Sequence, residues 1–296
     1  MKSTNRLGLR LPDGVAPYLF LAPGLALFLV FRMFPLLSGV PYSFTSWNGI
    51  ATPTYVGLRN YIQLFTSDPS FRDAVINALT VLATLPIWVG LPLILAVLIY
   101  LNVPAGKFFR VAYFVPVVLS SVIIGTMFNI ILRFDGVFNF VLESFGFDAV
   151  DWIGGKHTAL LSVISVAIWS HFGMNVLIFL SGLATFPGDV IDAAKIDGAN
   201  LLQIIVRIIV PLLFPMIQFV SVITTISMLT AMFGLIYVMT QGGPGTATYM
   251  PEYLIWLMQG DTNRLGYATA IGMVLFLFVG ACGLLQITFL FRSDTD

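Results

Sequence analysis

Six stretches of about 20 apolar residues dominate this sequence and restrict the folds that it can adopt. A helix needs about 20 apolar residues to cross a bilayer core about 30 Å thick, and every backbone group in lipid must be hydrogen-bonded within the protein. The two-residue alternation typical of outer-membrane barrels is absent. We therefore predict an all-α membrane protein with six transmembrane helices near residues 16–38, 76–100, 111–133, 158–184, 212–240 and 266–291.

The composition supports a polytopic membrane protein. Hydrophobic residues make up 58% of the chain and charged residues only 9%, so most of the chain can neither face water nor fill one soluble core. The formal net charge is +0 and no basic cluster alternates with aromatics, so a nucleic-acid partner is not expected. The two histidines and the single cysteine, Cys282, lack metal-ligand spacing, and we expect no metal site.

Lysine and arginine in the flanks predict the orientation. With a cytoplasmic N-terminus, that side carries more of them than the other side, and the flank of the first span is the clearest. The apolar stretch that follows is longer than a signal peptide requires and has no small-residue cleavage site, so we expect a retained span. Residues 1–15 then form a cytoplasmic tail, residues 16–296 form the membrane domain, and both termini are cytoplasmic. The cytoplasmic set is Lys2, Arg6, Arg10, Lys107, Arg110, Lys195, Arg207 and Arg292, and the opposite set is Arg59, Arg72, Arg133, Lys156 and Arg264.

The loop between the fourth and fifth spans contains the stretch DAAKIDGANLLQ, which predicts two short helices joined at an elbow. Asp189 is placed to cap the first helix, and Gly198 to end it, because glycine enters the left-handed region without steric penalty. Asn200 and Gln203 have the spacing of a capping box and open a second helix that runs to Pro211.

The first of these helices offers a surface for close contact. Ala193 and Ala194 have almost no side-chain bulk, so a partner can approach the backbone closely. The local pattern alone leaves open that this is an ordinary charged helical loop between two spans.

The longer stretch DAAKIDGANLLQIIVRIIVPLLFP resembles the EAA loop of ABC importer permeases. Asp192 replaces the family's glutamate and Val210 its leucine, and both changes keep the chemistry. The resemblance implies a coupling loop at 187–211 that docks into a groove of an ATPase. The implied ATPase-coupling residues are Asp192, Ala193, Ala194, Lys195, Asp197, Gly198, Ala199, Ile208 and Pro211.

Other stretches resemble the maltose-type sugar permeases of the same family. They are FLAPGLALFLVFRMFPLL, SFTSWNG, VGLRNYIQLF, IWSHFGMNVLIFLSGL, YVMTQGGPGTAT and LGYATAIGMVLF. The resemblance implies a type I ABC importer permease in a bacterial-type inner membrane, taking up a mono- or oligosaccharide. It also implies a second homologous permease, two ATPase subunits and an extracytoplasmic sugar-binding protein as partners.

The chain contains no nucleotide-binding motif that we can find. VPAGKFFR and WIGGKHT contain Gly-Lys, but neither continues with Ser or Thr as a phosphate-binding loop requires. Asp148 and Asp151 read as an exposed acidic turn rather than a catalytic pair. We expect no catalytic residue and no cofactor on this chain, with ATP and Mg on the partner ATPase.

Two polar stripes inside the spans are candidates for the substrate path, because polar groups in lipid are costly. The alternative for both is helix packing, in which Ser and Thr bond across helices and Met fills gaps. Trp169 has the chemistry to stack on a sugar but is interpreted as a packing residue. The candidates, at helical spacing, are Ser170, His171 and Met174 in the fourth span and Thr225, Met228, Leu229 and Met232 in the fifth.

Three alternatives to sugar uptake remain open. Arg32 lies well inside the first span within snorkelling reach of the outer face, and a glycerol phosphate-type substrate would need such a cation. An ion-coupled secondary transporter would instead carry carboxylates inside its spans, and this chain shows none there. A membrane scaffold without transport activity is a more distant third reading.

The segment QGGPGTATY after the fifth span is predicted to form a rigid turn.

Overall fold

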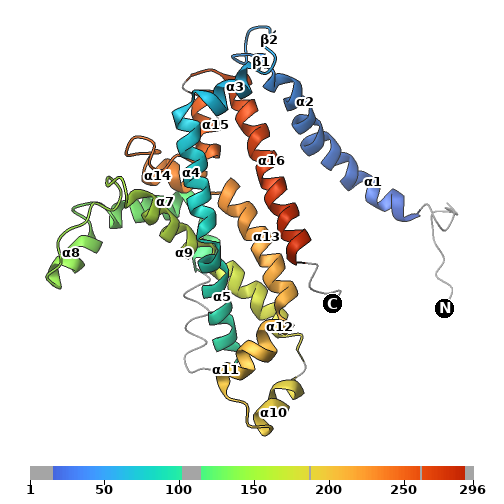
Figure 1. The fold of residues 1–296 in the computed structure, drawn as a ribbon, viewed down its shortest axis with the longest axis vertical. Coiled ribbons are helices and arrows are strands. Elements are labelled where there is room, and N and C mark those ends of the chain that lie inside the picture. The colour runs from blue at the N-terminus through green and yellow to red at the C-terminus, as the bar shows by residue number, and fades with distance from the viewer. Residues whose placement is uncertain (1–15, 102–114, 187, 261, 291–296) are drawn as a thin grey trace, which may run out of the picture.

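The computed structural model describes residues 16–101, 115–186, 188–260 and 262–290 of the chain. The molecule is elongated, with β1 and β2 at one end and α10 and α11 at the opposite end (Figure 1). Thr45–Ser46 (β1) and Thr54–Tyr55 (β2) pair antiparallel, with Thr45 opposite Tyr55 and Ser46 opposite Thr54. The expected cytoplasmic tail, residues 1–15, lies outside the described residues.

Helices make up most of the described chain. The first half contains α1 (Ala16–Phe28), a π-helical turn (Leu29–Met33), α2 (Phe34–Ser43), α3 (Arg59–Thr66), α4 (Pro69–Ala83), α5 (Leu85–Tyr100), α7 (Ser121–Ile131) and α8 (Val137–Ser144). The second half contains α9 (Ala159–Leu183), α10 (Gly188–Ile196), α11 (Leu201–Ile204), a second π-helical turn (Ile205–Ile209), α12 (Val210–Leu212), α13 (Phe214–Thr230), α14 (Phe233–Met239), α15 (Pro251–Gly260) and α16 (Leu265–Leu290).

Four helical segments of the described chain are long and apolar enough to cross a membrane, and a bent pair makes up to five. They lie on the first, second, fourth and sixth predicted spans. The second segment begins before the predicted residue 76, because Asp68, whose side chain accepts the Phe71 N–H, caps a helix that starts at Pro69. The four segments are Pro17–Ser43, Pro69–Tyr100, Ala159–Leu183 and Leu265–Thr288.

The third predicted span, 111–133, begins outside the described residues. Its described part contains α7, which has 11 residues and is too short to cross a bilayer alone. Ser120 caps α7 by accepting a hydrogen bond from the Ile123 N–H at 3.3 Å, so a new helix starts in the middle of the predicted range.

The fifth predicted span, 212–240, is not one continuous helix. The helical segments before and after Leu213 meet at 68°. Pro215 follows directly, and proline has no N–H for the bond to the residue four positions earlier. A second interruption separates α13 from α14 at Ala231, whose φ of −129° is not helical. The prediction of a single helix over this range is therefore wrong.

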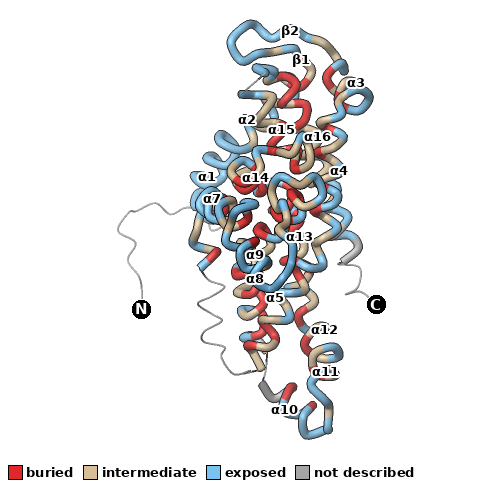
Figure 2. Tube along the Cα trace, turned by 90° about the vertical axis from the view of Figure 1, so that its left-hand side faces the viewer, coloured by how far each residue is buried: buried red, intermediate tan, exposed pale blue. Residues whose placement is uncertain are grey.

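The core runs along the axis of the bundle (Figure 2). One cluster of buried side chains joins α4, α7, α9, α13, α14 and α15, and a second joins α5, α9, α10 and the α11–α13 segment. In contrast, the apolar side chains of α1 are exposed, and no residue of the most apolar 18-residue window of the first span is buried, whereas α2 packs against α16. The α1 helix therefore presents an apolar surface to lipid or to another protein.

Candidate functional site

The predicted elbow is present at the end of the molecule that carries α10 and α11. Gly198 ends α10 with a φ of +80°, and its N–H donates to the Lys195 carbonyl at 3.1 Å. The N–H of Ala199 reaches back to the Ala194 carbonyl at 3.0 Å. This pair of bonds is the Schellman motif, which satisfies the last carbonyls of the helix and fixes the direction in which the chain leaves it.

The second helix of the elbow starts with the predicted capping box. The Asn200 side chain accepts the Gln203 N–H at 2.9 Å, and the Gln203 side chain accepts the Asn200 N–H at 2.8 Å. The helix continues to Leu212, one residue beyond the predicted Pro211. The cap predicted for the first helix differs, because α10 already includes Gly188 and Asp189 therefore lies inside the helix.

The coupling residues on α10 divide between two faces. Ala194 is buried against the bundle, as is Ile191, which was not among the predicted residues, whereas Ala193 is exposed. Ile196, which the sequence reasoning did not select, is 85% exposed at the end of α10. Of the alanine pair, only Ala193 is therefore available to a partner, next to an exposed apolar side chain.

The remaining coupling residues surround this face. Asp192 and Lys195 form an exposed ion pair at 3.1 Å, one helical turn apart, and surface pairs of this kind contribute little to stability. Asp197, Gly198 and Pro211 are exposed, and Ala199 and Ile208 are half-buried. The exposed surface of the elbow is thus formed by small, apolar and charged side chains.

The two predicted substrate stripes differ in exposure. Thr225, Met228, Leu229 and Met232 of the fifth span have exposed fractions of 2% or less, and the last three belong to the bundle core. In the fourth span, Met174 is 53% exposed, and Ser170 and His171 are half-buried. The fifth-span stripe is thus buried among neighbouring helices in this structure.

His171 is held on its own helix. Its Nδ1 lies 2.9 Å from the Ser170 Oγ and 3.0 Å from the Ala167 carbonyl oxygen. Its ring lies 5.4 Å from that of Trp88 in α5, centre to centre. The imidazole therefore joins α9 to α5.

A buried polar contact that the sequence reasoning missed connects three helices. Asn175 of α9 is 5% exposed and donates from Nδ2 to the Trp88 carbonyl of α5 at 3.1 Å and to the Thr224 hydroxyl of α13 at 3.2 Å. Thr225, which follows Thr224 in α13, accepts a hydrogen bond at 2.7 Å from the Gln286 amide of α16. Such bonds between helices stabilise membrane bundles.

Glu252 is a second residue that the sequence reasoning missed. It lies in the first turn of α15, outside the predicted spans, and its carboxylate accepts the backbone N–H groups of Met232 and Phe233. The pKa of Glu252 is raised to about 7. Burial raises it, and the two backbone hydrogen bonds act in the opposite direction with a smaller effect. Glu252 therefore caps α14 at the interruption of the fifth span.

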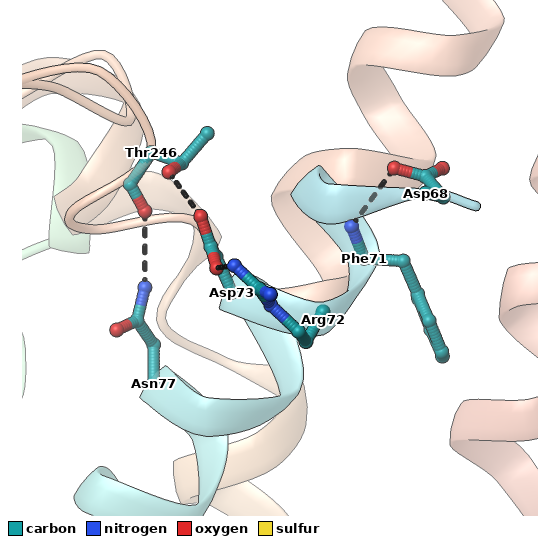
Figure 3. Close-up of polar contacts among 6 residues, drawn as sticks. All are labelled: Asp68, Phe71, Arg72, Asp73, Asn77 and Thr246. Carbon is teal, nitrogen blue, oxygen red and sulfur yellow. Dashed lines mark hydrogen bonds and ion pairs between the residues drawn. The ribbon is translucent and has the colours of Figure 1, made fainter. Parts of the chain in front are cut away.

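The predicted rigid turn after the fifth span is tied to α4 (Figure 3). The Thr246 hydroxyl donates to Oδ2 of Asp73 at 2.6 Å, and Nδ2 of Asn77 donates to the carbonyls of Thr246 and Tyr249 at 3.1 and 2.9 Å. Within the turn, the Thr248 hydroxyl donates to the Gly243 carbonyl at 3.1 Å. These bonds hold the segment between α14 and α15 against the first turns of α4.

The other residues weighed from the sequence take ordinary positions. Arg32 is exposed on the π-helical turn of the first span, and Asp151 accepts the Gly154 N–H at 2.8 Å in a surface turn. Trp169 packs edge-on against Phe128, with ring centres 5.2 Å apart. Cys282 is a half-buried free thiol. Within the described ranges, no group of three or more metal-ligating side chains comes together.

A bundle of long apolar helices with a capped elbow at one end is the architecture of a multi-pass membrane protein. The sequence of residues 69–292 matches the family model described as binding-protein-dependent transport system inner membrane component. The chain therefore belongs to this family, and it is a multi-pass permease subunit of an ABC import system.

Curated relatives match over nearly their whole length. The probable ABC transporter permease protein YurN of Bacillus subtilis is 33% identical over 93% of this chain and 96% of its own. The multiple sugar-binding transport system permease protein MsmF of Streptococcus mutans is 34% identical, covering 90% of this chain and 92% of its own. The arabinooligosaccharides transport system permease protein AraP of Bacillus subtilis is 33% identical, covering 92% and 87%.

Solved structures share the fold. A chain of a bacterial ABC transporter involved in the import of the acidic polysaccharide alginate superposes with a TM-score of 0.82 at 24% identity, covering 95% of this chain and 96% of that one. A chain of the alginate transporter in complex with its alginate pentasaccharide-bound periplasmic protein superposes with a TM-score of 0.81 at 23% identity, covering 97% and 98%. The type I importer permease fold is thus confirmed.

Proposed function

We propose that this chain is one permease half of an ATP-driven importer that takes up a mono- or oligosaccharide delivered by an extracytoplasmic binding protein. Relatives named for sugar and arabinooligosaccharide transport support the substrate class, as does the fold shared with an alginate importer. The binding protein follows from the family to which the chain belongs. The second permease and two ATPase subunits complete the proposed assembly.

The elbow at α10 is the observation that carries this proposal. It is fixed by the backbone hydrogen bonds at Gly198 and by the side-chain cap at Asn200, and its buried face, with Ala194, rests on the bundle. A push on the exposed face at Ala193 and Ile196 would therefore be transmitted to α9 and α13 as a rigid-body movement. In the proposal this face is cytoplasmic and docks into a groove of the ATPase, which binds ATP and Mg.

The substrate passage opens in the proposal when the helices rearrange. Met228, Leu229 and Met232 are packed in the core here, so contact with a sugar requires α13 to move away from its neighbours. Ser170, His171 and Met174 are less buried, so a sugar can contact them before α13 has moved. The bend at Leu213 and the interruption at Ala231 divide the fifth span into segments that can move separately.

Reconstitution tests this function. The complex isolated through a tag on this chain is placed in liposomes, and uptake of labelled oligosaccharides is measured with the binding protein and internal Mg-ATP. Uptake that needs both, and that stops with a non-hydrolysable ATP analogue, is the expected result. Uptake by this chain alone on an ion gradient would instead identify a secondary transporter, and uptake of a glycerol phosphate in place of a sugar would correct the substrate class.

A further inference from the structure

The loop between α7 and α9 presents an apolar surface that neither the coupling role nor the substrate path uses. It contains α8 and projects from the side of the bundle (Figure 1). An exposed apolar surface of this kind marks a contact with lipid or with another protein. Seven large apolar side chains of the loop, between 43% and 76% exposed, form what we call the α8 surface: Phe134, Val137, Phe138, Phe140, Val141, Phe145 and Phe147.

The polar side chain in the middle of α8 faces the protein. Asn139 is 1% exposed, and its Nδ2 donates to the Phe134 and Val150 carbonyls at 3.0 and 2.8 Å. Its Oδ1 accepts the Val150 N–H at 3.1 Å and the Trp152 indole N–H at 2.9 Å. The amide therefore makes every hydrogen bond that it can make, and it makes all of them inside the loop.

The amphipathic pattern of α8 is consequently reversed. Val137, Phe140 and Val141 share one side of the helix by their spacing, and all three are exposed. A helix on the surface of a water-soluble protein turns its polar side outward and its apolar side toward the core. The surroundings of α8 are therefore apolar.

The polar groups at the C-terminal end of α8 are also bonded within the loop. The N–H groups of Phe145 and Phe147 donate to the Leu142 carbonyl at 3.0 and 3.1 Å, and the Ser144 hydroxyl donates to the Val141 carbonyl at 2.7 Å. A surface in contact with lipid must satisfy its polar groups internally, whereas a protein interface makes about one hydrogen bond per 100–200 Å². This internal bonding favours lipid over a protein partner.

The position of α8 places this surface beside two spans. Phe138 packs edge-on against Trp152, with ring centres 5.2 Å apart, and lines an apolar cleft together with the first turns of α9. In the proposed orientation these turns lie at the extracytoplasmic edge of the bilayer core. On the other side, the α8 surface continues into exposed apolar side chains of α7, namely Ile123, Met127 and Ile130.

The charges of the loop exclude attraction to anionic headgroups. No lysine or arginine occurs between residues 134 and 155 of the sequence. Arg133, just before the loop, is paired with Asp135 at 3.1 Å, and Glu143 and Asp148 are exposed carboxylates. Interfacial helices that bind anionic lipids carry lysine and arginine on their polar side. Contact of α8 with a membrane therefore depends on its apolar side chains.

We propose that α8 is a membrane-interface anchor whose apolar side inserts among the lipids of the extracytoplasmic leaflet. Insertion of the phenylalanine rings removes apolar area from water and holds the loop, and with it the start of α9, at a fixed depth. The inference goes beyond the proposed function and rests on the membrane location and orientation of the chain, not on its substrate. The competing occupant is a surface of the second permease, and the experiment separates the two.

The experiment measures the surroundings of single spin labels on the intact complex in lipid nanodiscs. In a Cys282→Ser background, Phe140→Cys and Phe145→Cys place the label on the α8 surface. Asp148→Cys is the matched control, because it is exposed in the same loop but carries a charged side chain. Power saturation gives the collision rates of each label with oxygen, which concentrates in lipid, and with a nickel chelate, which stays in water.

The labels at Phe140 and Phe145 are expected to collide several-fold more often with oxygen than with the chelate, and the label at Asp148 should show the reverse. These preferences should stay the same when zwitterionic lipids replace anionic ones, because the contact is apolar.

Unlabelled protein provides a second measurement. The double variant Phe140→Ser with Phe145→Ser should lower the melting temperature of the complex in nanodiscs, because two rings no longer insert into lipid. Ile50→Ser is its control, since Ile50 is 94% exposed at the β1–β2 end of the molecule and its removal takes no side chain out of lipid.

Three outcomes overturn the proposal. The labels at Phe140 and Phe145 collide mainly with the chelate, or they are immobile and shielded from both reagents, which would assign the α8 surface to the second permease, or the double serine variant melts as the wild type does. Neither measurement involves ATP or sugar, so these outcomes leave the proposed function intact. Absence of ATP-driven sugar uptake by the wild-type complex would contradict that function without affecting the anchor.

Discussion

Asn175 of α9 donates a hydrogen bond to the hydroxyl of Thr224 in α13 at 3.2 Å, and the same amide donates to the Trp88 carbonyl of α5. Three spans thus meet at one buried side chain. The bond is remote from both ends of the bundle, so its removal tests packing of the spans separately from partner binding.

Asn175→Leu keeps most of the volume but removes both bonds, and we expect it to lower the free energy of unfolding by about 1 kcal/mol, as interhelical bonds in membrane proteins typically do. Unfolding in mixed detergent micelles measures the change. Ser181→Ala on the same helix is the matched control, because the Ser181 hydroxyl is exposed and bonds only to the Leu177 carbonyl one turn away. Equal stability of the Asn175 variant and the control would show that the contact contributes nothing.

Glu252 gives the stability of the protein a predictable pH dependence. Its pKa is raised from 4.5 to about 7, so the folded chain binds more protons than the unfolded chain between these values. Stability contributed by the protonated carboxyl is therefore lost as the pH rises through this window, by about 3 kcal/mol in total.

Glu252→Gln removes the titration and keeps an acceptor for the N–H groups of Met232 and Phe233. The melting temperature of the wild type, relative to that of this variant, should fall between pH 5 and pH 8. A constant difference across that range would be inconsistent with a buried titrating carboxyl. Glu252→Ala should be less stable than Glu252→Gln at both pH values, because two buried N–H groups lose their acceptor.

The elbow was predictable because its signals are local. Gly198 supplies the left-handed residue, and Asn200 and Gln203 supply the capping box, all within a few residues of one another. The burial of Ala194 and the exposure of Ile196 were not predictable, because they depend on how α10 packs against the bundle.

The bend at Leu213 has a local signal in Pro215, but the interruption at Ala231 has none. No proline or glycine stands at Ala231 or Met232, and the carboxylate that caps the new helix comes from Glu252, twenty residues later in the sequence. The contact between Asn175 and Thr224 is likewise long-range. Apolar runs therefore predict that spans exist, whereas a break without proline, such as that at Ala231, and the polar contacts between spans depend on tertiary structure.

Gly198→Val tests whether the shape of the elbow matters. A Cβ at this position meets no atom within 4 Å, so the penalty comes only from the φ of +80°, and we expect a local destabilisation of about 1 to 2 kcal/mol. ATP-driven uptake should fall far more than stability, because the exit direction of the chain changes. Gly198→Asn is the control, since asparagine tolerates the left-handed region better. Wild-type uptake and ATPase association in the valine variant would exclude a coupling role.

Cysteine labelling at Ala193 tests most directly whether α10 is a cytoplasmic helix that docks onto the ATPase. A Cys282→Ser background removes the only native thiol, and Ala193→Cys then places a single thiol on the exposed face of α10. A membrane-impermeant maleimide is applied to right-side-out and inside-out vesicles, with and without the ATPase subunits. The account predicts labelling only from the cytoplasmic side and protection by the bound ATPase. Labelling from the outside, or equal labelling with and without the ATPase, would contradict it.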